Sequence, residues 1–565
     1  MPFVFLLLVA APMVLLGGTL AAAAPDDSPG ATETILYNGI RQVEPWPPEY
    51  REMSRDKPAP VPYLDAPPAV IPIDVGRQLF VDDFLIESTS LHRVFHKADF
   101  YENNPVLRPD RPWEHESSAD ASRPASAANP FSDGVWYDPR DQVFKMWYSA
   151  GYYPHRCYAT SHDGIDWVKP DLGVVPGTNI FFAGCDTSTV WLDLEEQDPA
   201  KRFKLWREDR GILGLGIYYS ADGIHWGKPL GRTGSAPSPC TVFWNPFRGV
   251  WVYSMRASCA GMGRYRRYWE TQDPLVGIHW DALDRPEVGP QSKGPMRLPL
   301  WVWADKFDHG YADSDFPAEL YNLDAVAYES IMLGMFSMMR QDTTDQRPKV
   351  KEQVLGYSRD GFHWHRPDRE SFIGVSDDLA AWNAGNIQSA GGCCLVVGDQ
   401  LYFYVSGRRY FVSQQGEPRG EYTTGLATLR RDGFASMGAD KSGGTLTTRP
   451  VTFGGKHLFV NFAAAAGELQ VELLDADGRV MEPFGRAQCV PLRGDRTLQQ
   501  VRWRTADDLS SLAGRPVKFR FHLTDGKLYA FWVSPERSGA SHGYVAAGGP
   551  GFTGPTDTVG RPNGP

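Results

Sequence analysis

Carboxylate side chains occupy corresponding places in a repeated sequence pattern. The pattern is a pair of short strands joined by a turn, and it occurs five times, at residues 133–149, 188–207, 240–256, 323–340 and 393–408. Asp133 and Asp324 each stand two residues before the valine that marks their first strand, Asp186 stands four residues before its valine, and Glu319 lies just before the fourth pair. Two carboxylates facing one channel could cleave a glycosidic bond, one protonating the leaving oxygen and the other activating water or attacking the sugar.

Arginine ends the second strand in four of the five pairs: Arg207, Arg256, Arg340 and Arg408. His155 and Arg156 stand at the corresponding place after the first pair, and Tyr152 in the same loop could stack on a sugar. The start of the first strand and the end of the second lie at the same end of an antiparallel hairpin, so we expect acids and arginines on one rim. Two interpretations stay open: a structural ring of salt bridges, or arginines that bind an anionic or hydroxyl-rich ligand.

A second repeat follows the strand pairs and shows how they are connected. The heptapeptide SHDGIDW (161–167) recurs as SADGIHW (220–226) and SRDGFHW (358–364), with weaker copies at 430–434 and 273–280. Glycine accepts the positive φ of a tight turn, and the Ser and Asp side chains can bond the turn amides. The tryptophan that follows is expected to pack between layers.

The spacing of these units predicts blades of a β-propeller. The steps between Val135, Val190, Val242, Val326 and Leu395 are 55, 52, 84 and 69 residues, and an insertion at 281–320 lengthens the third. Units of this size with four strands are typical of propeller blades. We therefore predict an all-β protein, a five-bladed β-propeller followed by a C-terminal β-sandwich. We expect the segment LFVDDFLIE (79–87) to supply a strand that closes the ring.

Composition divides the rest of the chain. The boundaries that we predict are a signal peptide (1–24), a Pro-rich segment (25–72), the propeller (73–440), the sandwich (445–535) and a disordered tail (538–565). Residues 3–24 are uncharged and end in small residues, which predicts export to a secreted, periplasmic or cell-surface location. No other membrane span is expected.

The chain has 18 tryptophans, 24 tyrosines and 29 phenylalanines, a content that suits a sugar-binding β protein. Its net charge of −11 argues against nucleic acid as a partner. Seven scattered cysteines show no zinc spacing, so we expect no metal at the site and no cofactor. A structural calcium ion is an open alternative at the oxygen-rich insertion, which holds Asp305, Asp308, Asp313 and Asp315.

The chain resembles the five-bladed β-propeller glycoside hydrolases of families 32, 43, 62 and 130, and the secreted relatives of family 32 from planctomycete-type bacteria. The resemblance rests on the SHDGIDW copies, on DVGRQLFVDDFLIE (74–87) and on DGVWYDPRDQVFKMWYS (133–149), and it covers about residues 74–440. It implies that Asp133 acts as nucleophile or base, Asp186 as a tuning residue, and Glu319 or Asp324 as the acid. The chain lacks the invertase motifs W-x-N-D-P-N-G, R-D-P and E-C-P.

These observations predict a secreted, monomeric glycoside hydrolase with carbohydrate as its partner. It is expected to act on a poly- or oligosaccharide, with acidic and sulfated glycans among the candidate substrates. Two alternatives stay open. One is a non-catalytic glycan-binding propeller with the same rim. The other is a sialidase-like exo-glycosidase, which requires a tyrosine nucleophile paired with a glutamate and three clustered arginines at the axis.

Overall fold

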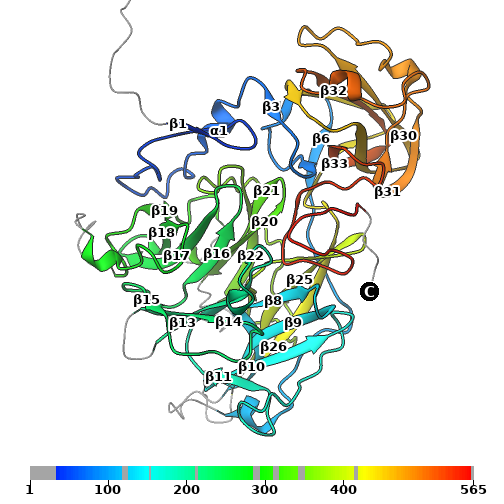
Figure 1. The fold of residues 1–565 in the computed structure, drawn as a ribbon. Helices are drawn as coiled ribbons and strands as arrows, with labels where there is room; N and C mark the ends of the chain where they lie inside the picture. Colours follow the sequence, from blue (N-terminus) through cyan, green and yellow to red (C-terminus); the bar gives the residue numbers. More distant parts are fainter. Residues whose placement is uncertain are drawn as a thin grey trace, which may run out of the picture.

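The computed structural model describes residues 33–116, 125–151, 154–209, 214–283, 293–308, 317–340, 350–412 and 418–560. Its described elements are mostly antiparallel strands, together with a four-residue α-helix, α1 (Pro62–Asp65), and five short 3-10 helices, at Pro112–His115, Pro199–Lys201, Trp280–Ala282, Arg486–Gln488 and Ser510–Leu512. Figure 1 shows a lower body of sheets, coloured cyan to yellow, and a separate orange body beside the blue N-terminal segment. The predicted all-β class is confirmed.

The lower body, called the ring below, consists of strands that pair in five consecutive sets. The first set is β8 (Ala125–Asp138), β9 (Val143–Ala150), β10 (His155–Ser161) and β11 (Ile180–Ala183). The second is β12 (Ser188–Leu192), β13 (Phe203–Glu208), β14 (Leu215–Ser220) and β15 (Gly231–Arg232). The third is β16 (Thr241–Asn245), β17 (Val250–Cys259), β18 (Gly263–Thr271) and β19 (Leu300–Val302). The fourth is β20 (Glu319–Glu329), β21 (Ile331–Arg340) and β22 (Val350–Ser358). The fifth is β23 (Asn386–Ser389), β24 (Leu395–Val397), β25 (Gln400–Val412) and β26 (Pro418–Arg430), with β7 (Asp99–Phe100) on its edge.

Hydrogen bonds link each set to the next in cyclic order. The bonds are Trp136 Nε1 to Val190 O, Thr187 Oγ1 to Cys240 O, Thr241 Oγ1 to Leu323 O, Gln353 Nε2 to Ile387 O, and Val135 N to Gly391 O. Strand β8 also pairs in parallel with β26, which joins the first set to the fifth. The sets therefore follow the order predicted for the blades, and the number of blades itself stays a prediction.

Tryptophans fill the spaces between neighbouring sets. Trp147 of the first set packs on Phe203 of the second, with ring centroids 5.6 Å apart, and Trp206 of the second packs on Trp251 of the third at 5.0 Å. Both Trp147 and Trp206 are fully buried. Buried aromatic rings contribute strongly to the core, because each removes a large apolar area from water. Strands buried on both faces, such as β9 and β21, follow from this face-to-face packing.

The Ser-x-Asp-Gly turns have the predicted local chemistry. In the first copy Ser161 Oγ donates to Asp163 Oδ1, and the Gly164 amide donates to Ser161 Oγ. The other two copies repeat these bonds. The three glycines have φ between +76° and +79°, which L side chains rarely adopt.

Gly223→Ala is expected to lower the free energy of unfolding by at least about 2 kcal/mol, because positive φ strain and overpacking add. A methyl group at Gly223 (φ +76°) would lie 2.6 Å from Trp147 Cζ2. Gly177→Ala is the matched control, since Gly177 has φ +78° and open space around it. Urea unfolding of both variants measures the difference. Equal losses would show that packing at Gly223 adds nothing.

The orange body, called the second body below, is one nine-stranded sheet with its own core. Its main path runs β5 (Ile86–Thr89), β28 (Gly444–Thr448), β32 (Lys518–Thr524), β30 (His457–Leu474), β33 (Gly526–Ser534), β27 (Ala435–Ala439) and β6 (His92–Phe95). Strand β31 (Leu492–Gln500) pairs with β30, and β4 (Gln78–Leu79) pairs with β33. A two-sheet sandwich stays a prediction.

Residues 79–87 do not close the ring, contrary to our expectation. Strands β4 and β5 pair with β33 and β28 of the orange body, whereas β7 pairs with β26 of the ring. Phe80 explains the difference, because its ring stacks on Phe531 with centroids 5.7 Å apart in the core of the second body. The chain thus passes through the nine-stranded sheet of the second body both before it enters the ring of five sets and after it leaves that ring.

The two terminal segments are packed against the rest of the molecule. Residues 33–72 form β1 (Glu33–Ile35), β2 (Arg41–Val43), α1 and β3 (Ile71–Pro72), which pairs with β29 (Val451–Thr452). The tail predicted as disordered is ordered through residue 560: β34 (Tyr544–Val545) pairs with β20. The Ala547 amide donates to Cys394 O, and Asp557 is buried. A Cβ atom at Gly543 or Gly549 would clash with Glu329 or Val396, so these glycines let the segment pack closely against the fourth and fifth sets. Residues 1–24 lie outside the described residues.

Candidate functional site

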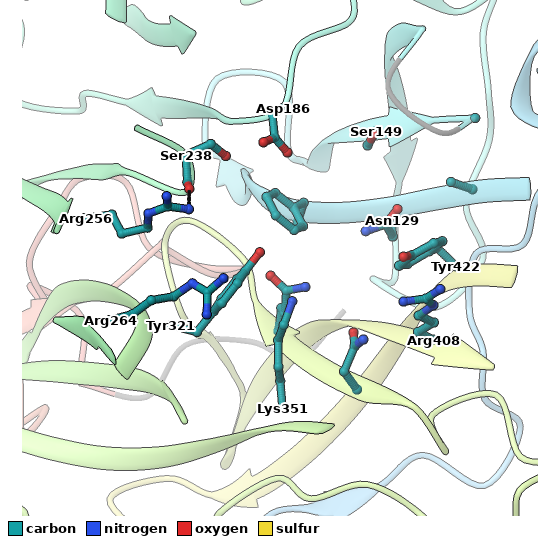
Figure 2. Close-up of a pocket in the computed structure, with 15 residues that line it drawn as sticks. Asn129, Ser149, Asp186, Ser238, Arg256, Arg264, Tyr321, Lys351, Arg408 and Tyr422 are labelled. Carbon is teal, nitrogen blue, oxygen red and sulfur yellow. Dashed lines mark hydrogen bonds between the residues drawn. The ribbon is translucent and has the colours of Figure 1, made fainter. Parts of the chain in front are cut away.

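A polar cavity of about 220 Å³ opens on the ring, lined by residues of the first, third, fourth and fifth sets and by Asp186, which precedes the second set. The labelled side chains in Figure 2 are Asn129, Ser149, Asp186, Ser238, Arg256, Arg264, Tyr321, Lys351, Arg408 and Tyr422. Asn386 and Gln388 of β23 also line it. Of the acids and arginines expected on one rim, Asp186, Arg256 and Arg408 line this cavity.

The depth of each predicted acid depends on where its strand begins. Asp186 precedes the first residue of β12 and lines the cavity. Strand β8 begins eight residues before Asp133, so Asp133 lies within the strand and only 1% of it is exposed. Strand β20 begins at Glu319, so Asp324 is likewise internal and 3% exposed. The structure therefore brings Asp186 to the cavity, whereas Asp133 and Asp324 are buried and are not among its lining residues.

Asp133 belongs to a buried polar group that supports the cavity floor. Its Oδ1 accepts a bond from Ser188 Oγ, and its Oδ2 lies 3.3 Å from Arg156 Nε. Arg156 also donates to Ser149 Oγ at 2.7 Å and to Cys185 O at 2.9 Å. Burial raises the pKa of Asp133, while Arg156 and Ser188 oppose the shift. Arg156 thus connects Asp133 to the residue preceding Asp186.

Asp324 lies in a second buried group. It accepts hydrogen bonds from Ser389 Oγ and from Asn322 Nδ2, and Asn322 Nδ2 also donates to Ser132 Oγ at 3.1 Å. Burial raises the pKa of Asp324 to about 7, against the opposing effects of Ser389, Arg266 and Asn322. This carboxyl group therefore titrates near neutral pH.

Asp324→Asn is expected to change how stability depends on pH. Between pH 4 and pH 7 the folded wild type retains a proton that the unfolded chain releases, so its unfolding free energy falls by up to about 1.4 kcal/mol per pH unit. The variant lacks this loss, and the stability difference should move in its favour up to about pH 7 and then level off. Urea unfolding from pH 4 to pH 8 measures it. A constant difference would mean that Asp324 has an ordinary pKa.

Glu319 lies beside the cavity and is already engaged. Its Oε2 accepts bonds from the backbone amide and from Nη1 of Arg264, both at 2.9 Å. Arg264 lines the cavity, whereas Glu319 is not among its lining residues. Glu319 therefore neutralises one of the cations at the rim.

The predicted arginines divide into two groups. Arg256 and Arg408 line the cavity. Arg207 does not; it stacks on Phe182 and donates to the carbonyl oxygens of residues 183 and 184. Arg340 forms an ion pair with Glu352 in a neighbouring cavity. A closed ring of salt bridges between the predicted arginines and acids is therefore not formed among the described residues.

Two further predicted residues belong to the first set and the loop within it. His155 Nε2 lies 2.7 Å from Glu116 Oε2, and His155 is not a lining residue of the cavity. Tyr152 lies outside the described residues.

The cavity also contains residues that the sequence analysis missed, among them Arg264, Tyr321, Lys351 and Tyr422. Arg264 and Lys351 are the second residues of β18 and β22, the third strands of their sets. In an antiparallel meander a third strand starts at the same end as the first. Extending the hairpin argument by one strand would have found both cations.

The oxygen-rich insertion does not form a metal site in the described part of the chain. Asp305 and Asp308 are paired with Arg366 and Arg369 at 2.5–3.3 Å. Asp313 and Asp315 lie outside the described residues. Across the described ranges no cluster of three or more metal-ligating side chains occurs, and no helix there is long and apolar enough to cross a membrane.

No protein-family model and no curated protein matches the chain. Among solved structures, an N-acetylgalactosamine deacetylase from F. plautii is 13% identical, with a TM-score of 0.38 over 58% of this chain and 97% of that one. A thermostable family-43 glycoside hydrolase is 13% identical, with a TM-score of 0.35 over 55% and 94%. A Bombyx mori family-32 β-fructofuranosidase is 12% identical, with a TM-score of 0.33 over 76% and 95%. Glycoside hydrolases are thus among the structural neighbours, at a similarity too low to carry an argument about activity.

Proposed function

We propose that the protein is an exported glycoside hydrolase whose active site is the cavity on the ring, with Asp186 as a catalytic acid or base. The supporting observation is that Asp186 is the one carboxylate among the described lining residues. Amide groups of Asn129, Asn386 and Gln388 face the same cavity and suit sugar hydroxyls. In this proposal Asp133 and Asp324 are buried positioning residues that do not touch the sugar.

Hydrolysis of a glycosidic bond also needs a second group, as base or nucleophile. Tyr321 and Tyr422 both line the cavity with a phenolic oxygen, and we assign the role to Tyr321 because its ring reaches into the centre of the cavity (Figure 2). Burial and the nearby Asp186 raise the pKa of Tyr321, while Arg264 and Arg256 oppose the shift. Tyr321 would therefore have to lose its proton during the reaction rather than before it.

A sialidase-like exo-glycosidase is the second candidate. The observation that favours it is the meeting of three arginines, Arg256, Arg264 and Arg408, around Tyr321 in one cavity. Glu319 accepts its bonds from Arg264, so it would have to exchange this partner to serve Tyr321 as a base. Cleavage confined to terminal, carboxylated sugars would distinguish this candidate from a hydrolase of internal linkages.

The test is release of reducing ends or free sugar from neutral, uronic, sulfated and sialylated glycans, measured with the purified mature protein. Release that Asp186→Asn removes supports the hydrolase. Binding of a glycan without release from any of them would instead establish the non-catalytic glycan-binding alternative. Sequencing the N-terminus of the exported protein tests the predicted cleavage near residue 24.

A further inference from the structure

We infer that the cavity recognises an oxyanion carried by a sugar, either a carboxylate or a sulfate ester, and that Arg256 binds it. The inference rests on the proposed function only in taking a glycan as the ligand. Four cations, Arg256, Arg264, Lys351 and Arg408, line the same small cavity as one carboxylate, Asp186. They enter from several sides of it, with Arg408 opposite Arg256 and Arg264 (Figure 2).

Arg256 is held by neutral atoms. Its Nη1 donates to the Ser238 carbonyl oxygen, and its backbone amide donates to Cys240 Sγ at 3.4 Å. Its Nε is buried and makes no hydrogen bond within the described structure. Among the described residues these neutral atoms hold the guanidinium group and no carboxylate pairs with it, so its charge remains available to an oxyanion in the cavity.

Aromatic rings position the other cations. Lys351 Nζ lies 3.6 Å above the Tyr321 ring centroid, and the Arg408 guanidinium lies 5.0 Å above that of Tyr422. A cation–π contact helps to hold a cation in place. Arg264 is held by its ion pair with Glu319. Because the lining contains four cations and one carboxylate, its charge favours an anionic ligand.

A further buried cation bonds the backbone of Tyr321, one of the lining residues. Arg266 is fully buried and donates to the carbonyl oxygens of Pro239, Ser254 and Tyr321 and to the Ser254 hydroxyl. Burial lowers the pKa of Arg266 to about 10, which leaves it protonated at neutral pH. Arg266 adds positive charge under the site while fixing the backbone at Tyr321.

The test is isothermal titration calorimetry of the full-length mature protein at low salt with glucose, glucuronate, glucose 6-sulfate and inorganic sulfate. We expect at least one anionic sugar to bind tenfold or more tightly than glucose, and to weaken as salt rises. The preferred anionic sugar identifies the group as carboxylate or sulfate. Arg256→Met should weaken that binding about tenfold, and Arg256→Lys should restore part of it. Arg479→Met is the control, since Arg479 is exposed in the second body.

Equal binding of glucose and both charged sugars, binding of none of them, binding of inorganic sulfate alone, or unchanged binding by Arg256→Met would overturn the inference. The two proposals fail separately. Charge-selective binding without cleavage of any glycan would support this inference and overturn the hydrolase. Cleavage of a neutral glycan without charge selectivity would do the reverse.

Discussion

Asp186→Asn is expected to lower the rate of glycan cleavage by about 10²- to 10⁴-fold, the usual contribution of a general acid or base. The residue is held in place from its backbone: its amide donates to Glu208 Oε2 at 3.0 Å, and Arg156 bonds the preceding carbonyl. The asparagine should therefore occupy the same position and bind glycan with similar affinity. Initial rates and titration calorimetry on the same glycan separate the two effects.

Asp477→Asn is the matched control, because Asp477 is an exposed aspartate in a turn of the second body. Asp133→Asn gives the decisive contrast. If Asp133→Asn abolished cleavage with unchanged folding while Asp186→Asn remained active, the buried acid would be the catalytic one and our assignment would be wrong. A loss in both variants, with a shifted pH profile only for Asp133→Asn, would place Asp133 as a positioning residue.

Arg431→Leu is expected to lower the free energy of unfolding by about 3–5 kcal/mol, the cost of breaking a buried ion pair. Arg431 is 2% exposed and pairs with Glu329 at 3.0 Å and with Asp557 at 2.9 Å. Arg77 completes the cluster by pairing with Glu329 and Asp432. These five groups join the N-terminal segment, the fourth and fifth sets and the tail, and their formal charge is already −1. Losing Arg431 would leave a charge of −2 in a buried site.

The electrostatics of the cluster show the same dependence on arginine. Burial raises the pKa of Glu329, and the acids beside it add to the shift. Burial also opposes ionisation of Asp432, yet Arg77 and Arg431 hold the pKa of Asp432 below its usual range. Urea or thermal unfolding measures the loss in Arg431→Leu. Arg479→Leu is the control, because its pair with Asp477 is exposed and should cost less than about 0.5 kcal/mol. A similar small loss in Arg431→Leu would show that the cluster is not energetically coupled.

Short sequence motifs predicted the features that depend only on interactions between neighbouring residues. The SHDGIDW turn depends on one glycine at positive φ and on bonds within four residues, so its copies at Gly164, Gly223 and Gly361 could be predicted without any tertiary contact. The repeated strand pairs and their spacing likewise predicted the all-β class. Antiparallel geometry alone also predicted that the start of the first strand and the end of the second lie at the same end of a hairpin.

Tertiary structure decided how deep each side chain lies and which body each edge strand joins. The sequence around Asp133 does not show that β8 begins at Ala125, because that start depends on pairing with β26. Asp186 reaches the cavity because β12 begins two residues after it, whereas Asp133 lies eight residues inside β8. The pairing of Leu79 and the order of the tail through residue 560 also depend on tertiary structure. Their strand partners lie hundreds of residues away in the sequence and come close only in the assembled sheets. Hydrogen bonding within a few residues is encoded in a motif, whereas burial is a property of the whole fold.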